Sequence, residues 1–504
     1  MAAPLKLSSD DRALFSLVTE ASLANPFSQR RLELDAKMGA GSRTARPLDT
    51  ALARVAERVS RLEASGHARA ALYEPADREL VFFTVLFDAF HRHAADFDRH
   101  VAEQRKAGDE PVPLAFAGEA LALLERRGIG AEEARRLLAL FYQLRRAFFF
   151  IDGSLVGRSP SMRALRERLW RNLFSDDLRS YTRYLWNRME DFSTLLLGET
   201  GTGKGAAAAA LGRSGFIPFD ERKGAFVQSF MRSFVAINLS QYPETLIESE
   251  LFGHRKGAFT GAIDAHEGVF ARCSAHGAIF LDEIGDVMPP VQIKLLQVLQ
   301  ERTFSPVGSH EKQRFAGRVI AATNRPLERL RREGRFRDDF YYRLCSDVIV
   351  VPPLRERLAE EPAELDMLLE HLVERLAGES VPELVGRVRG AFAHDLRAGY
   401  AWPGNVRELE QAVRRALLDR RYAGAARTLP GGWPERLARG IEASALDAAA
   451  LVRGYCALLH ERFGTYEEVA RRTGLDRRTV KKHVVAALKE TAREQAVPSR
   501  TGRP

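Results

Sequence analysis

Residues 194–211 constrain the fold of this chain more than any other stretch. A short apolar run, Thr194 to Leu197, predicts a buried strand, and the alanine-rich run 206–211 predicts a helix. Between them lies a glycine-rich loop that ends in a lysine, made of Gly198, Glu199, Thr200, Gly201, Thr202, Gly203 and Lys204. In such a loop, backbone N–H groups and the helix N-terminus surround a polyphosphate, and the lysine reaches its outer phosphates. The stretch therefore predicts a phosphate-binding loop.

A second apolar run, Ala278 to Leu281, ends in the acidic pair Asp282 and Glu283. An acidic pair at the end of a buried strand suits a Mg²⁺ ligand, Asp282, and a residue that orients or deprotonates the attacking water, Glu283. An ordinary turn with a solvated acidic pair is the alternative. Because both halves of a nucleotide site are present in the correct order, we expect the chain to bind and hydrolyse ATP with Mg²⁺.

The segment between the two nucleotide motifs contains a run of small residues around a single large aromatic side chain, Phe259. The run consists of Gly257, Ala258, Phe259, Thr260, Gly261 and Ala262. It is too small to build a core, and its glycines permit a tight exposed loop. An aromatic residue at the tip indicates a contact surface, although a turn with an inward-facing Phe259 would have the same sequence.

These motifs resemble the sigma-54-dependent transcription activators, also called bacterial enhancer-binding proteins, a family of AAA+ ATPases. The hexapeptide 257–262 matches the family's defining loop, and the resemblance covers about half of the chain, from about Leu155 to about Leu417. It implies an α/β AAA+ P-loop ATPase core with a helical lid, preceded by a mainly α N-terminal domain and followed by an α helix-turn-helix domain. It also implies that residues 257–262 contact sigma-54.

The resemblance assigns roles to residues outside the two nucleotide motifs. Val156 and Gly157 are expected to border the adenine. Asn238, at the end of its strand, is expected to hold the catalytic glutamate away from the water. Thr323 and Asn324 lie at the tip of another predicted strand, where the family senses the γ-phosphate or its water.

Three arginines have expected phosphate roles. Arg407 matches the family's second sensor, a phosphate contact from the lid. Arg337 and Arg343 match the arginine-finger segment and would reach the ATP of a neighbouring subunit, which implies a ring, in this family a hexamer. Ion pairs within one subunit are the alternative for these two residues.

Two positions depart from the family pattern. Gly205 follows the loop lysine, where many phosphate loops place a hydroxyl that binds Mg²⁺, so more of the metal binding falls to Asp282 and water. Arg255 stands where the family often has an acidic residue, and it is expected to change how the base of the 257–262 loop is held.

Length, charge and cysteines set broader bounds. A chain of 504 residues should hold about three domains. The net charge of +9 suits a nucleic-acid partner but also follows from an arginine-rich composition. Cys273, Cys345 and Cys456 are scattered and fit reduced thiols, and no long apolar span or secretory segment is present. We expect a cytoplasmic protein with no membrane partner.

Residues 1–150 are expected to form a helical regulatory domain. Apolar residues at helical spacing mark helices at 48–62, 78–94 and 131–150. No alternation of strands and helices is evident, which argues against a phosphoacceptor receiver domain. A metal site among His91, His93 and His100 is conceivable, but their spacing matches no standard motif and a solvated helix end is favoured.

Two stretches, 176–193 and 216–233, are longer than the family pattern and rich in aromatic and basic residues. They either pack on the N-terminal domain or form surface excursions. The ATPase core is expected at 151–355, its α/β part, and 356–422, its lid.

The C-terminal part is expected to bind DNA. A linker at 423–440 precedes a helix-turn-helix domain at 441–490, with helices at 466–473 and 476–485, and 491–504 is expected to be disordered. The second helix presents the candidate DNA contacts Arg477, Arg478, Thr479, Lys481, Lys482 and His483. A solvated basic helix is the alternative.

Together these features predict an activator that binds upstream enhancer DNA as a double strand, assembles into a ring, and remodels the closed complex of sigma-54 RNA polymerase holoenzyme into an open one. A DNA-binding regulator that uses ATP only as an assembly ligand is the alternative. A general AAA+ remodeller of other proteins is disfavoured by the 257–262 loop and the basic C-terminal helix.

Overall fold

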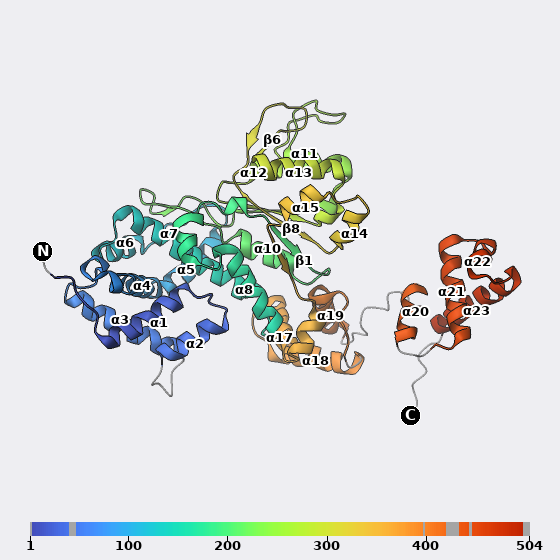
Figure 1. Cartoon of the computed structure of the whole chain (residues 1–504), viewed down its shortest axis with the longest axis horizontal. Coiled ribbons are helices and arrows are strands. Elements are labelled where there is room, and N and C mark those ends of the chain that lie inside the picture. Colours follow the sequence, from blue (N-terminus) through green and yellow to red (C-terminus); the bar gives the residue numbers. More distant parts are fainter. Residues whose placement is uncertain (1–2, 40–46, 397–398, 420–432, 443–445, 497–504) are drawn as a thin grey trace. The chain divides into compact units, whose positions relative to one another are not determined.

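A computed structural model describes residues 3–39, 47–396, 399–419, 433–442 and 446–496 (Figure 1). The chain divides into two compact units. One contains residues 1–390 and 397–420, and the other contains residues 391–396 and 421–504. In the described residues, no helix is long and apolar enough to cross a membrane.

The described N-terminal residues form helices, as predicted. Their bounds are α1 Ser9–Leu23, α2 Gln29–Met38, α3 Pro47–Ala64, η1 Ala70–Leu72, α4 Pro75–Arg92, α5 Ala94–Ala107, α6 Ala117–Arg126 and α7 Ala131–Ser154. Helices α1 to α4 enclose a core of their own, which includes Phe15, Val55 and Val85. Helix α4 contributes to two cores, because Phe87 is buried in the core of α1 to α4, while Phe82 and Phe90 are partly buried against the neighbouring core.

A five-stranded parallel sheet lies at the centre of the following part, in the order β4-β5-β8-β1-β9. The strands are β1 Thr194–Leu197, β4 Phe234–Asn238, β5 Ala278–Asp282, β8 Arg318–Thr323 and β9 Asp347–Val350. Side chains alternate between the two faces of a strand. Leu196 and Phe280 therefore pack with α7, α8 (Pro160–Phe174) and α10 (Lys204–Gly212). Leu195 and Ile279 pack on the other face, with α11 (Glu244–Phe252), α13 (Pro289–Glu301) and α15 (Asp338–Leu344). A parallel sheet covered on both faces agrees with the predicted α/β ATPase fold.

The helices around the sheet begin with α8 Pro160–Phe174, α10 Lys204–Gly212, α11 Glu244–Phe252, α12 Val269–Arg272, α13 Pro289–Glu301, α14 Leu327–Arg332 and α15 Asp338–Leu344. Short 3-10 turns, η4 Leu239–Gln241 and η5 Ile284–Asp286, follow β4 and β5, and β6 Thr303–Phe304 pairs with β7 Gln313–Arg314. The helices that follow the sheet are α16 Leu354–Glu360, α17 Glu364–Ala377, α18 Pro382–Asp395 and α19 Asn405–Asp419.

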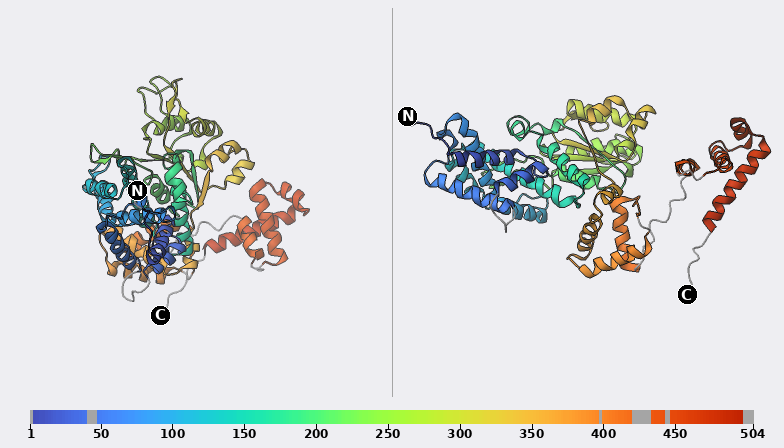
Figure 2. Two further views of the ribbon diagram at one scale, coloured as in Figure 1. Left: turned by 60° about the vertical axis from the view of Figure 1, so that its left-hand side comes forward. Right: turned by 60° about the horizontal axis from the view of Figure 1, so that its bottom comes forward.

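The N-terminal region and the sheet share one hydrophobic core. This core runs from Phe97 and Leu138 through Leu169 to Leu196 and Phe280 without interruption. The two ribbon views in Figure 2 show the N-terminal helices lying against the sheet-containing part. Helix α7 therefore belongs to both regions, and it continues to Ser154, four residues beyond the predicted end of the N-terminal domain.

The two long stretches pack on the N-terminal region, which decides between the alternatives left open by the sequence. They contain α9 Leu178–Ser180, η2 Tyr181–Leu185 and η3 Met189–Asp191 in the first, and β2 Phe219–Asp220 and β3 Ala225–Phe226 in the second. Phe226 stacks on Tyr142 of α7 with ring centroids 3.9 Å apart, and Tyr181 Oη donates to Gln143 Oε1 at 2.9 Å. We call these stretches the first insertion (176–193) and the second insertion (216–233).

The other unit contains α20 Trp433–Glu442, α21 Ala448–Phe463, α22 Tyr466–Thr473 and α23 Arg477–Ala496. Helix α20 lies where the sequence predicted a linker, and residues 423–432 of that linker are outside the described residues. Helix α23 extends to Ala496 into the predicted tail, of which residues 497–504 are not described. A small core of Cys456, Leu459, Val469, Val480 and Val484 joins α21, α22 and α23.

Candidate active site

The glycine-rich loop joins β1 to α10 as predicted. Gly201 and Gly203 adopt φ values of 80° and 104°, a conformation that favours glycine. Lys204 is buried, and its Nζ donates to the carbonyl oxygens of Gly198 at 2.9 Å and Glu199 at 3.1 Å. Burial lowers the pKa of Lys204, whereas the nearby acids Glu283 and Asp282 oppose that shift. The lysine thus lies between the loop and the acidic pair.

The acidic pair lies at the carboxyl end of β5. Burial raises the pKa of both carboxyls, and for Glu283 the neighbouring Asp282 adds to the shift. Glu283 adopts φ 57° and ψ 45°, which is uncommon for a residue with a side chain, and its Oε2 has no hydrogen-bond partner among the described residues. A half-buried carboxylate with a raised pKa and an uncommitted oxygen is suited to accept a proton from a water.

The neighbouring strand β8 places two more predicted residues at the same edge of the sheet. Asn324 Nδ2 donates to Thr200 Oγ1 at 2.7 Å, so this residue contacts the phosphate loop directly. Thr323 is fully buried, and its Oγ1 accepts the N–H of Arg325 at 3.1 Å. Thr323 is therefore occupied in shaping the strand end, while Asn324 points to the loop.

Asn238 pairs in register with Asp282, as expected for a residue beside the acidic pair. However, its Oδ1 accepts hydrogen bonds from the N–H (3.0 Å) and Oγ (2.7 Å) of Ser240. Among the hydrogen bonds of the described residues, none joins Asn238 to Glu283. The predicted restraint of the glutamate is thus not formed in this structure, because the amide oxygen caps its own turn.

The lid contacts the phosphate loop through Asn405, a residue for which the sequence predicted no role. Asn405, at φ 54°, donates from Nδ2 to Glu199 Oε2 and to the Thr200 carbonyl, both at 3.1 Å. Its Oδ1 accepts the N–H of Leu354 at 2.7 Å. Arg355 binds Glu199 through two hydrogen bonds of 2.8 and 2.7 Å. Together these contacts fasten the lid to the loop.

Arg407 lies against the same loop. A Cβ on Gly201 would lie 2.9 Å from Arg407 Cβ and 2.3 Å from the Gly404 carbonyl oxygen, so only glycine fits this approach. The Arg407 charge also contributes to the lowered pKa of Lys204, which places the guanidinium within electrostatic reach of the lysine. This position is suitable for a phosphate contact.

The predicted adenine border is held by a buried ion pair of the lid. Arg357 and Glu364 are 3% and 0% exposed and pair with each other. Arg357 Nη2 donates to the Val156 carbonyl at 2.6 Å, and Gly157, at φ 134°, leaves no room for a Cβ beside the Glu364 carboxylate. The segment before α8, which contains Val156 and Gly157, is therefore held against α16 and α17 by these contacts.

The two candidate arginine fingers both have partners within this chain. Arg337 forms two hydrogen bonds with Asp339, at 3.0 and 2.7 Å, on the surface. Arg343 donates to the Leu299 carbonyl from Nε at 3.0 Å and from Nη2 at 2.8 Å, which caps the end of α13. Arg337 is exposed, whereas Arg343 is half-buried. An exposed ion pair such as Arg337 with Asp339 can be exchanged for another partner at little cost in free energy.

The donors present suit Mg²⁺ bound together with phosphate. Mg²⁺ is usually held by one or two carboxylates, phosphate oxygens and water, and Asp282 offers such a carboxylate close enough to Lys204 of the loop to raise its pKa. In the described part of the chain, no group of three or more His, Cys, Asp and Glu side chains could hold a metal by itself. Gly205 is exposed, a Cβ at this position would meet open space, and the residue supplies no side-chain oxygen.

The 257–262 loop is closed at its base and exposed at its tip. Gly257 N–H donates to the Ala262 carbonyl at 2.8 Å, and Ala262 N–H donates to the Phe259 carbonyl at 3.0 Å. Phe259 is 37% exposed and rests edge-on against His254 with centroids 4.9 Å apart, while Thr260 is exposed. The alternative of a fully inward-facing Phe259 is thus not what the structure contains.

A second loop supports this one. Arg255 N–H donates to the Val307 carbonyl at 3.1 Å, and Arg255 Nη2 pairs with Glu311 at 2.6 Å. Ala258 lies so close to Gly308 that a Cβ there would be 2.8 Å away. The basic residue at position 255 is therefore accommodated by an acid on the second loop. Both loops project at the top of Figure 1, beyond α11 and α13.

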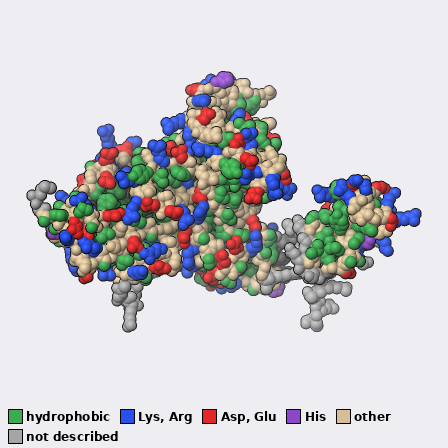
Figure 3. All heavy atoms as spheres, in the orientation of Figure 1, with side chains coloured by type: hydrophobic (Ala, Val, Ile, Leu, Met, Phe, Trp, Pro, Cys, Tyr) green, Lys and Arg blue, Asp and Glu red, His purple; other side chains and the backbone are tan. Residues whose placement is uncertain are grey.

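The C-terminal unit contains the two predicted helices, joined by a turn at Gly474 with φ 71°. Asp476 caps α23 by accepting the N–H groups of Arg478 (2.8 Å) and Thr479 (3.0 Å). The basic side chains are exposed, as the blue margins of this unit in Figure 3 show, whereas Thr479 and His483 are half-buried. The exposed basic ones are Arg477, Arg478, Lys481 and Lys482.

Comparison with known proteins identifies relatives over much of the chain. The family described as Sigma-54 interaction domain matches residues 178–350, and the AAA+ ATPase lid domain matches residues 359–423. The transcriptional regulatory protein ZraR of Klebsiella oxytoca is 38% identical over 332 residues, covering 65% of this chain and 67% of that protein.

Two further relatives are similar over shorter spans. The Nif-specific regulatory protein of Azotobacter vinelandii is 37% identical over 318 residues, 62% of this chain and 54% of that protein. The DNA-binding transcriptional regulator NtrC of Azospirillum brasilense is 40% identical over 261 residues, 52% of this chain and 47% of that protein. The chain thus spans about half the length of several curated relatives that it matches.

Proposed function

Because the chain belongs to the sigma-54-dependent transcription activators, we propose that it uses ATP hydrolysis to convert a closed promoter complex of sigma-54 RNA polymerase into an open one. The observation that carries this proposal is the exposed 257–262 loop on the same domain as a complete set of nucleotide elements. A loop with Phe259 and Thr260 at its tip offers a contact surface that nucleotide-driven movement can displace.

ATP lies along the phosphate loop in this proposal. The loop N–H groups and Lys204 hold the phosphates, and Asn324 and Arg407 approach them from β8 and the lid. Glu283 accepts the proton of the attacking water, which its raised pKa and uncommitted Oε2 favour. Asp282 would hold Mg²⁺ together with the phosphates, and the ion would neutralise charge there.

In the proposed active assembly, the subunits form a ring in which an arginine of one subunit reaches the ATP of its neighbour. Arg337 lies on the surface in an ion pair with Asp339 that a neighbouring subunit's phosphates can replace, because a doubly bonded guanidinium suits phosphate as well as carboxylate. Arg343 supports this segment by capping α13. We propose that Arg337 acts in trans and that the active assembly is a closed ring, hexameric as in the family.

DNA binding is assigned to α22 and α23. The exposed basic side chains of α23 face solvent on an amphipathic helix held by a small core, which suits insertion into the major groove. Binding double-stranded enhancer DNA would raise the local concentration of protein and favour ring assembly.

The proposal is tested by promoter opening on supercoiled DNA with sigma-54 polymerase, using wild type, Thr260→Ala and Thr245→Ala. Thr245 is an exposed threonine of α11 with no side-chain hydrogen-bond partner among the described residues, so it is the matched control. We expect Thr260→Ala to hydrolyse ATP normally and to lose promoter opening. Thr245→Ala should behave as wild type. Opening at the wild-type rate by Thr260→Ala would remove the loop from the mechanism.

A further inference from the structure

Helix α7 connects the N-terminal region to the end of the phosphate-loop helix. Gln143 Nε2 donates to the Ser214 carbonyl at 3.1 Å, and Arg146 Nη2 donates to the Gly215 carbonyl. Both side chains are almost fully buried, and Ser214 and Gly215 lie two and three residues beyond the end of α10. A displacement of α7 would therefore also displace the C-terminal end of α10, the helix that begins at Lys204.

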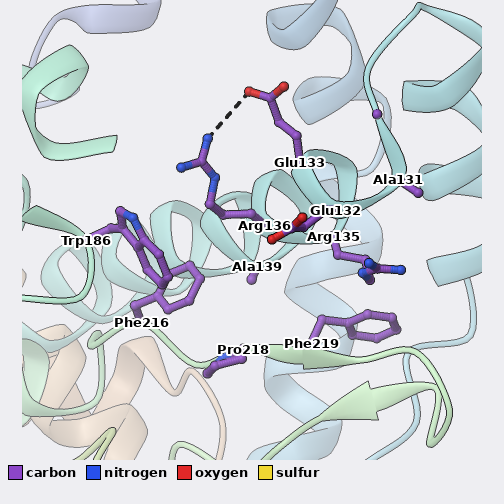
Figure 4. Close-up of a pocket in the computed structure, with 11 residues that line it drawn as sticks. Ala131, Glu132, Glu133, Arg135, Arg136, Ala139, Trp186, Phe216, Pro218 and Phe219 are labelled. Atoms are coloured by element: carbon purple, nitrogen blue, oxygen red, sulfur yellow. Dashed lines mark hydrogen bonds and ion pairs between the residues drawn. The ribbon is translucent and has the colours of Figure 1, made fainter. Parts of the chain in front are cut away.

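A cleft of about 750 Å³ opens where α7 meets both insertions. Figure 4 shows its three walls, one from the first turns of α7, one from Trp186 in the first insertion and one from Phe216 to Phe219 at the start of the second. Its size matches that of a small-molecule site. Since the walls come from three separate segments, a molecule bound here would tie them together.

One part of the cleft is aromatic. Trp186 and Phe216 contact edge to face with ring centroids 4.8 Å apart, and Phe219, fixed against Phe226 at 5.5 Å, lies beyond Pro218. Trp186 and Phe216 are only partly buried, so their surfaces face the cleft (Figure 4). Such a surface favours a planar aromatic group.

The α7 wall carries one acidic and one basic side chain that make few polar contacts with the described residues. Glu132 and Arg136 stand one turn apart on the face that also carries Ala139. Glu132 has no side-chain ion pair or hydrogen bond among the described residues. In the described part of the chain, Arg136 makes only two long polar contacts, each 3.5 Å, to Glu133 and the Thr182 carbonyl. By contrast, Arg135 is paired with Glu221 at 2.7 Å.

We propose that this cleft binds a small dipolar aromatic compound, one ring that carries both an acidic and an amino group. The ring packs on Trp186 and Phe216, the carboxylate binds Arg136, and the ammonium group binds Glu132. A ligand with a single charge would leave one of these two side chains without a partner. The ligand links α7 to both insertions and so stabilises the position of α7, which contacts the chain just beyond the end of α10. Its effect on ATP hydrolysis rests on the proposed function, whereas its binding does not.

The test follows the fluorescence of Trp186 in the full chain during titration with L-phenylalanine, phenylpropionate, which lacks the amine, and phenethylamine, which lacks the acid. We expect a saturable change with L-phenylalanine that is absent in Trp186→Phe. Each single-charge probe should bind about two- to fivefold more weakly, as expected for loss of one partly exposed ion pair. Arg136→Met and Glu132→Gln should weaken L-phenylalanine binding by a similar factor.

Arg163→Met, an exposed arginine of α8 away from the cleft, is the control and should bind as wild type. No saturable change with any of the three probes would overturn the proposal, and equal binding of phenylpropionate or phenethylamine would overturn the dipolar class. Because binding is measured without polymerase or DNA, its failure is distinguishable from a failure of promoter opening. A change in ATPase rate on ligand addition, lost in Arg136→Met, tests the link to α10.

Discussion

Replacing Glu364 by glutamine tests how firmly the lid holds the segment before α8. The buried carboxylate accepts hydrogen bonds from the N–H groups of Arg158 (2.8 Å) and Ser159 (2.7 Å) and pairs with buried Arg357. Glutamine keeps the shape and one acceptor oxygen, so the change chiefly removes the charge that neutralises Arg357. Removing one partner of a buried ion pair costs about 3–5 kcal/mol, because the remaining ion stays desolvated.

The cost should appear as faster amide hydrogen exchange in residues 155–162, measured by mass spectrometry. A loss of about 3 kcal/mol corresponds to an increase on the order of a hundredfold in local opening. The double variant Arg357→Met/Glu364→Gln removes both charges and should exchange more slowly than the single variant. Glu374→Ala, an exposed position on the same helix, should exchange as wild type. Unchanged exchange in Glu364→Gln would show that the buried ion pair does not hold this segment.

Three further predictions concern hydrolysis, the lid contact and DNA. Burial raises the pKa of Glu283, so ATP hydrolysis should be lost, as pH falls, at a value above about 4.3, the ordinary glutamate pKa, because the base becomes protonated. Glu283→Gln should reduce turnover about 10²–10⁴-fold and spare ATP binding, measured by nucleotide titration. Gly201→Ala should weaken ATP binding about tenfold or more, since its Cβ would lie 2.3 Å from a lid carbonyl, whereas Gly205→Ala, which meets open space, should bind ATP normally. Lys482→Ala should weaken binding to all DNA sequences alike and lower the slope of log affinity against log salt by about 1. Normal turnover by Glu283→Gln would contradict the first prediction, and normal ATP affinity of Gly201→Ala would contradict the second. An unchanged salt slope in Lys482→Ala would contradict the third.

Local sequence was enough to predict the elements that carry the nucleotide motifs. Strand β1 begins and ends at the predicted residues, and α22 does as well, because an apolar run or an N-cap with a following glycine specifies these elements within a few residues. The same holds for the order of the loop, the acidic pair and the 257–262 segment along the chain.

Contacts between distant residues could not be predicted in this way. Asn405 meets Glu199, and Glu364 meets Arg158, across about two hundred residues of sequence, and nothing local marks these pairs. The Pro-Gly-Asn turn at 403–405 was a signal that Asn405 holds a special backbone conformation, since asparagine tolerates positive φ. Its role at the loop required the fold.

The insertions illustrate the same limit. Their aromatic and basic composition fitted both a packed and an exposed arrangement. The tertiary contacts of Phe226 with Tyr142 and of Tyr181 with Gln143 show that both insertions are packed. Helix α7 likewise continues past residue 150, the expected end of the N-terminal domain, and packs on the sheet as well as on the N-terminal helices.

Hydrolysis, and not ATP binding alone, opens the promoter in the proposed mechanism. This step is tested by probing single-stranded promoter DNA after adding this protein, sigma-54 polymerase and either ATP or a non-hydrolysable ATP analogue. We expect an open complex with ATP and none with the analogue, at equal occupancy of the nucleotide site. Equal opening with both nucleotides would contradict the mechanism and favour ATP as an assembly ligand.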